Sequence, residues 1–167
     1  NKYSNGLIFM TACKYGEIQY FILKNQIEQA EKSVEDYISI FGKDNFYFEI
    51  QRHNDAEEEA IIRTFAGFSR KFGARLAATN DAHYINRSDS KYQDALMCIQ
   101  TGNYLTDTNR YKYNTDALYL KSADEMYDLF VDYPEAVENA VRISQQCNTL
   151  LDFGANKFHF PVFELPE

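Results

Sequence analysis

The stretch that decides the fold is Arg75-Leu76-Ala77-Ala78-Thr79-Asn80-Asp81-Ala82-His83-Tyr84. It is a short apolar run that follows Gly73 and ends in an Asp-x-His pair. The run is too short for a helix, so it predicts a buried strand at about 75–79. Residues two apart in an extended chain point the same way, so Asp81 and His83 are expected to converge. A carboxylate and an imidazole together suit a divalent metal such as zinc or manganese.

Two further stretches have the same form. Residues 7–12 are apolar and end at Cys13, and an aromatic-rich run at about 45–51 ends close to His53. Three strands therefore each end on a side chain that can bind a metal or exchange a proton. In barrels of alternating strands and helices, the carboxyl ends of the strands carry the chemistry. The sequence thus predicts one site at the strand ends.

Helical patterns separate the three strands. One patch spans 17–23, and a second, at about 26–41, has apolar residues at three- and four-residue steps. Asp55 is placed to cap a third helix at 56–72, with the acidic run 57–59 interpreted as its solvated first turn. The alternation of strand and helix favours a parallel sheet and an α/β fold in which helices follow short parallel strands.

The second half of the chain predicts mostly helix. We expect, in order, a helix to about 100 capped by Ser88 or Asp89, a loop at 101–116, a strand at 117–120, a helix at 123–130 and a helix at 134–147. Ser122 and Glu125 have capping-box spacing, and Pro134 suits a first helical position. The tyrosines at 104–119 can stack bases, although an aromatic loop packed on itself is the simpler interpretation.

Composition limits the class of protein. The 167 residues suffice for one domain, and a formal charge of -8 is unusual for a free-standing nucleic-acid binder. The three cysteines show no paired spacing, which favours a reducing compartment. No apolar run approaches the roughly 18 residues of a membrane span. We therefore expect a cytoplasmic protein without a membrane partner.

Each candidate site residue also has a structural interpretation. Cys13 can be a small buried hydrophobe, the Asp-x-His pair can be a polar turn after a strand, and His53 can hydrogen-bond a loop. Three or four ligands are too few for a polynuclear metal site. If such a site exists, part of it lies outside this chain.

Several blocks in order along the chain resemble the PHP (polymerase and histidinol phosphatase) domain of the bacterial replicative DNA polymerase III alpha subunit family. They are Thr11-Ala12-Cys13-Lys14-Tyr15-Gly16-Glu17, Phe46-Tyr47-Phe48-Glu49-Ile50-Gln51-Arg52-His53, Ala78-Thr79-Asn80-Asp81-Ala82-His83-Tyr84, Cys98-Ile99-Gln100-Thr101-Gly102, Leu118-Tyr119-Leu120-Lys121-Ser122 and Pro134-Glu135-Ala136-Val137-Glu138-Asn139. The order and spacing of these blocks make the resemblance specific and set it nearer the polymerase branch than free-standing phosphatases.

The resemblance implies a distorted (β/α) barrel of the PHP type with a metal cluster at the strand ends. It places metal ligands at Cys13, Asp81 and His83, and His53 in a motif that lines the site. The family's upstream HxH motif and downstream polymerase carboxylates are not in this sequence. We therefore expect residues 1–150 to be the carboxyl-terminal portion of a PHP domain, and 151–167 a connecting tail toward a polymerase region.

The resemblance also implies a function. It predicts part of a DNA-directed DNA polymerase subunit, a nucleotidyltransferase, with a metal-dependent phosphoesterase or 3'-5' exonuclease site. The alternative is a non-catalytic module that braces the polymerase or docks a proofreading subunit. Expected cofactors are zinc or manganese here, and magnesium in the polymerase region outside this chain. Expected partners are DNA, through the full subunit, and other replicase subunits. The isolated chain is expected to be inactive and to self-associate through its first strand.

Overall fold

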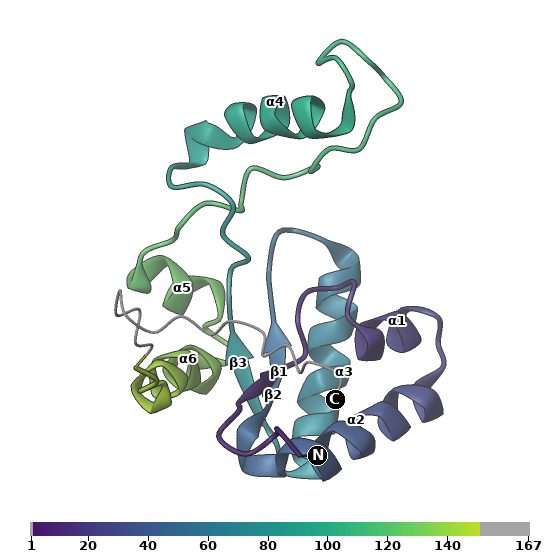
Figure 1. Cartoon of the computed structure of the whole chain (residues 1–167), viewed down its shortest axis with the longest axis vertical. Helices are drawn as coiled ribbons and strands as arrows, with labels where there is room; N and C mark the ends of the chain where they lie inside the picture. Colours follow the sequence, from purple (N-terminus) through teal and green to yellow (C-terminus); the bar gives the residue numbers. More distant parts are fainter. Residues whose placement is uncertain (1, 151–167) are drawn as a thin grey trace, which may run out of the picture.

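The computed structural model describes residues 2–150 (Figure 1). The elements are β1 Phe9–Met10, α1 Glu17–Leu23, α2 Ile27–Phe41, the 3-10 helix η1 Lys43–Asn45, β2 Phe46–Ile50, α3 Ala56–Phe72, β3 Arg75–Ala78, the 3-10 helix η2 Arg87–Asp89, α4 Ser90–Thr101, α5 Ala123–Leu129 and α6 Pro134–Gln146. The tail predicted at 151–167 lies outside the described residues.

The centre of the fold is a parallel three-stranded sheet in the order β1-β2-β3. Strand β2 is buried on both faces, as is usual for parallel sheets covered by helices. Its Phe48 packs on Phe65 of α3, with ring centroids 5.0 Å apart. This arrangement confirms the predicted α/β class and the parallel strands. Among the described residues the strands form an open three-stranded sheet, and a closed barrel is not seen there.

Local signals explain the helix boundaries. The Asp55 carboxylate accepts a hydrogen bond from the backbone N–H of Glu57 at 2.9 Å and caps α3, as predicted. Gly73 ends α3 with φ +68°, a left-handed conformation that glycine adopts without steric cost. The capping box of Ser122 and Glu125 opens α5, also as predicted.

Three predictions of local structure need correction. The first strand is Phe9–Met10 rather than 7–12, because Ala12 has φ +65° and turns the chain away from β2. Asp89 precedes α4 at the cap position, as predicted, but its side chain makes no capping hydrogen bond there; it instead forms a capping box with Asn86 that opens η2. The strand expected at 117–120 is a single parallel bridge between Tyr84 and Tyr119.

The two edges of the sheet differ. At the β3 edge, helix α6 packs against the strand. The Asn139 side-chain amide of α6 donates a hydrogen bond to the Leu76 carbonyl oxygen of β3 at 2.8 Å. Strand β1 has no further strand beside it among residues 2–150, as expected for the first strand. Phe9 of β1 stacks on Tyr37 of α2, with ring centroids 4.4 Å apart. The unpaired backbone edge of β1 therefore belongs to a strand whose Phe9 side chain is well packed.

Helix α4 and the loop that follows it project away from the sheet and its helices (Figure 1). Tyr92, Leu96 and Ile99 lie at helical spacing along α4, and all three are exposed. Cys13, Cys98 and Cys147 are free thiols, in agreement with the predicted lack of a disulfide framework. None of the helices within residues 2–150 combines the length and the apolar character that crossing a bilayer demands.

Candidate functional site

The backbone takes a left-handed conformation after each of the three strands. Ala12 has φ +65°, Asn54 has φ +63° and Asp81 has φ +48°. Each of these residues is a predicted site residue or the immediate neighbour of one. Non-glycine residues held in this region cost on the order of 1 kcal/mol or more each, and they cluster at functional sites. Three of the four non-glycine residues with positive φ in the described backbone thus lie at these strand ends, and the fourth is Asn25.

Glu49 holds the three strand ends together. Its carboxylate accepts hydrogen bonds from the Ala12 backbone N–H at 3.1 Å, the Thr79 hydroxyl at 2.5 Å and the Gln51 side-chain amide at 3.1 Å. The buried Gln19 amide donates to the Ala12 carbonyl oxygen at 2.9 Å and steadies the same turn. The turn that presents Cys13 is therefore fixed from two sides.

All four predicted site residues line one cavity of about 620 Å³ at these strand ends. Lys14, Lys112 and Tyr113 also line this cavity. The predicted residues come from three separate strand ends, so the parallel sheet is what brings Cys13, His53, Asp81 and His83 to a common space. Which of them act as ligands stays a prediction.

His83 has its ring nitrogens in distinct roles. Nδ1 lies 2.6 Å from the Asp81 carbonyl oxygen, which can only accept, so Nδ1 carries the proton. Nε2 lies 2.9 Å from the Tyr113 hydroxyl and, in the neutral ring, accepts its hydrogen bond. In this tautomer Nδ1–H donates to a backbone carbonyl and Nε2 carries the lone pair. Metal-ligating histidines usually have one ring nitrogen hydrogen-bonded in this way while the other nitrogen binds the metal.

The predicted geometry of the Asp-x-His pair is wrong in one respect. Asp81 has φ +48° rather than an extended conformation, so the strand geometry expected to point both side chains the same way does not apply here. The Asp81 Oδ1 atom lies 3.9 Å from His83 Nδ1 because the chain turns at Asp81. The turn allows the Asp81 carbonyl to orient the His83 ring, which an extended chain would not do.

His53 is held by acceptors on both sides of its ring. Nδ1 lies 2.7 Å from Glu58 Oε1, and Nε2 lies 2.9 Å from the Asn80 carbonyl oxygen. Burial alone lowers the pKa of His53, but the hydrogen bonds to Glu58 and Asn80 and the charge of Glu58 outweigh burial and raise it. Both partner atoms are acceptors, so in the protonated ring both nitrogens donate. The ring supports the chain just before Asp81.

Glu58 corrects the interpretation of the acidic run as a solvated helix start. Glu58 is buried at 8% exposure and also accepts from the His53 backbone N–H at 2.6 Å. A signal was present in the sequence, because Glu58 precedes Ile61, Ile62 and Phe65 by three, four and seven residues and so shares their apolar face.

Asn80 and Lys121 hold the loop that carries Asp81 and His83. The Asn80 amide donates to the Tyr119 carbonyl oxygen at 2.5 Å, and the Lys121 ammonium donates to Asn80 Oδ1 at 2.8 Å. Burial lowers the pKa of Lys121. These contacts join chain segments about forty residues apart, which is why sequence reasoning missed them.

Lys14, the residue after Cys13, is held by two carboxylates of the α3 start. Its ammonium lies 2.5 Å from Asp55 Oδ2 and 3.1 Å from Glu57 Oε2. The hydrogen bond to Asp55 is the main cause that raises the pKa of Lys14 above its usual range, so Lys14 stays protonated.

The donor types at this site suit a divalent cation. A thiol, a carboxylate and an imidazole line the same cavity, and zinc binds all three kinds of donor. Within residues 2–150, however, no three His, Cys, Asp or Glu side chains stand close enough together to form a metal site. The described residues therefore match in chemical type but do not by themselves complete a coordination shell.

Comparison with known proteins assigns the chain. A model of the PHP domain matches residues 1–53. The DNA polymerase III subunit alpha of Borreliella burgdorferi is 43% identical over 166 residues, which are 99% of this chain and 14% of that protein. The chain belongs to the DNA polymerase III alpha subunit family. The subunit alpha of Treponema pallidum is 40% identical over 147 residues, covering 88% of this chain and 13% of that protein.

More distant members of the family align over the same length. The DNA polymerase III subunit alpha of Thermus aquaticus is 33% identical over 170 residues, covering 99% of this chain and 14% of that protein. The chain thus spans about one seventh of the length of these relatives. The PHP match covers Cys13 and His53 and ends before Asp81 and His83.

Proposed function

We propose that this chain contributes one side of a metal-dependent phosphoesterase site in a full-length DNA polymerase III alpha subunit, and that the site removes nucleotides from the 3' end of DNA. The supporting observation is that Cys13, His53, Asp81 and His83 line one cavity although they come from three strand ends. The polymerase activity of such a subunit, a DNA-directed nucleotidyl transfer with magnesium, belongs to regions outside this chain.

The roles within the site follow from the chemistry of each group. Cys13, Asp81 and His83 are the proposed ligands of zinc or manganese, and His53 is a positioning residue behind the Asp81 loop. A divalent cation bound there supplies Lewis acidity and a nucleophilic hydroxide at neutral pH. Lys112 of the same wall makes no ion pair among residues 2–150, so its ammonium is available to a phosphate oxygen.

The test uses a full-length subunit that contains this chain. Asp81→Asn keeps the size of the side chain and removes its charge, and we expect metal-dependent release of nucleotides from a 3'-labelled single strand to fall at least about tenfold, the lower end of the effect of a disturbed metal site. Asp36→Asn, on an exposed position of α2, is the matched control. Equal nuclease rates in the two variants would contradict the proposal.

A second candidate function has its own observation. The exposed stripe of Tyr92, Leu96 and Ile99 on the projecting helix α4 suits contact with another protein surface, as expected for a non-catalytic module that braces the polymerase or docks a proofreading subunit. In that case Asp81→Asn leaves nuclease activity unchanged, whereas Leu96→Asp weakens association with the proofreading subunit in a pull-down of the full-length proteins.

A further inference from the structure

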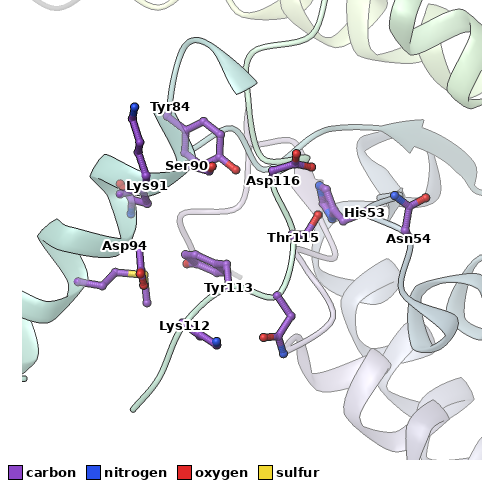
Figure 2. Close-up of a pocket in the computed structure, with 13 residues that line it drawn as sticks. His53, Asn54, Tyr84, Ser90, Lys91, Asp94, Lys112, Tyr113, Thr115 and Asp116 are labelled. Carbon is purple, nitrogen blue, oxygen red and sulfur yellow. The ribbon is translucent and has the colours of Figure 1, made fainter. Parts of the chain in front are cut away.

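A second cavity adjoins the first. It has a volume of about 610 Å³ and lies between α4 and the segment 112–116 (Figure 2). His53, Asn54 and the segment 112–115 line both cavities. The segment 112–115 therefore borders both cavities, which places them side by side.

The second cavity carries an excess of positive charge. Its two acidic residues are each neutralised by a two-pronged arginine contact: Asp94 by Arg110 at 2.5 and 2.7 Å, and Asp116 by Arg87 at 2.9 Å for both contacts. Its two lysines are Lys91 of α4 and Lys112 of the opposite segment (Figure 2). Neither makes an ion pair with a described residue. The cavity is thus a local cationic site on a chain whose formal charge is -8.

The remaining wall offers neutral donors and aromatic rings. Ser90, Asn114 and Thr115 supply hydroxyl and amide groups. Ammonium, hydroxyl and amide groups are the usual donors to phosphate oxygens. Tyr84 and Tyr113 both line this cavity. Aromatic rings can stack with unpaired bases.

We propose that this second cavity binds the sugar-phosphate backbone of a single-stranded nucleic acid whose 3' end lies in the first cavity, with Lys91 and Lys112 contacting phosphates. The direction of the strand rests on the proposed function, whereas binding itself does not. A volume of about 610 Å³ is that of a site for a drug-sized ligand, so it accepts a short stretch of one strand and not a duplex. Because the chain is acidic overall, binding is weak and strongly dependent on salt.

The test measures binding without hydrolysis. Fluorescence anisotropy of a labelled oligothymidylate is followed as the chain is added, in EDTA, at several low salt concentrations. We expect the slope of log affinity against log salt to become shallower by about 0.7 for each lysine removed, hence by about 1.4 in the double variant Lys91→Glu, Lys112→Glu. The matched control is Lys32→Glu, Lys43→Glu, which changes the net charge equally at exposed positions remote from the cavity.

The outcomes separate this inference from the proposed function, because no cation is present in the assay. A slope that falls in the cavity variant but not in the control supports the strand site, even if the full-length subunit has no nuclease activity. Equal slopes in the two double variants overturn it, even if Asp81→Asn abolishes nuclease activity. Absence of binding at the lowest salt, or equal affinity for a duplex of the same length, also overturns it.

Discussion

The buried contact between Glu58 and His53 supports the site, and replacing Glu58 by alanine tests how much. The Glu58 carboxylate accepts from the His53 backbone N–H at 2.6 Å and faces His53 Nδ1 at 2.7 Å. Both side chains are at least nine-tenths buried. Removing one partner of a buried charged pair costs about 3–5 kcal/mol, because the other partner is left without compensation. A loss of this size is a large part of the 5–15 kcal/mol by which typical domains are stable.

The measurement is urea unfolding of the chain, followed by circular dichroism near pH 6. We expect Glu58→Ala to lower the free energy of unfolding by about 3–5 kcal/mol, whereas Glu35→Ala, on an exposed position of α2, stays within about 0.5 kcal/mol of the parent. Glu58→Gln keeps an acceptor for the His53 backbone N–H and loses the charge, so its effect lies between the two. A loss below about 1 kcal/mol in Glu58→Ala refutes the reasoning.

The same contact has a predictable dependence on pH. The folded protein raises the pKa of His53 above its ordinary 6.5, so the folded state binds this proton more tightly than the unfolded state. The resulting stability is fully present below pH 6.5 and is lost as the pH rises through the folded pKa. The stability difference between the parent and Glu58→Ala should therefore narrow as the pH rises above 6.5. A difference that widens over this range would mean that Glu58 holds a neutral His53.

Three further variants test other parts of the structure. Ala12→Gly removes the cost of a side chain at φ +65° and should stabilise the chain by up to about 1 kcal/mol, seen as a higher Tm; a lower Tm would contradict the strain. Tyr113→Phe removes a hydrogen bond to His83 Nε2 worth about 1 kcal/mol. Zinc should then bind the chain roughly fivefold more tightly, measured by competition with a chelator. Unchanged zinc affinity would show that Tyr113 does not compete with zinc for His83 Nε2. Met10→Lys, on the open edge of β1, should reduce self-association in light scattering; a monomeric parent would exclude edge pairing.

Sequence patterns predicted the structure correctly where neighbouring residues determine it. The bounds of α1 and α3 follow from apolar spacing and from Asp55 and Gly73 at the ends of α3. The gathering of site residues also follows, because parallel strands present their carboxyl ends at one edge of the sheet. This argument needs only the order of strands and helices, without any knowledge of side-chain contacts.

The parts that could not be predicted depend on contacts between distant segments. Tyr113 reaches His83 across thirty residues from a loop without regular structure, and no local pattern marks it. The left-handed turn at Asp81 is stabilised from outside, through Asn80 and its contacts with the segment near Tyr119. Glu58 was misjudged because acidic residues in a first helical turn are usually solvated, whereas here one of them lies on the apolar face.

The central claim is that Cys13, Asp81 and His83 hold one divalent cation at the strand ends of a full-length alpha subunit. The most direct measurement is an anomalous difference map from crystals of that subunit grown with zinc. We expect a peak at about 2.3 Å from Cys13 Sγ and at about 2.0–2.2 Å from His83 Nε2 and an Asp81 carboxylate oxygen. A zinc peak bound elsewhere, with these three side chains outside bonding distance, would contradict it.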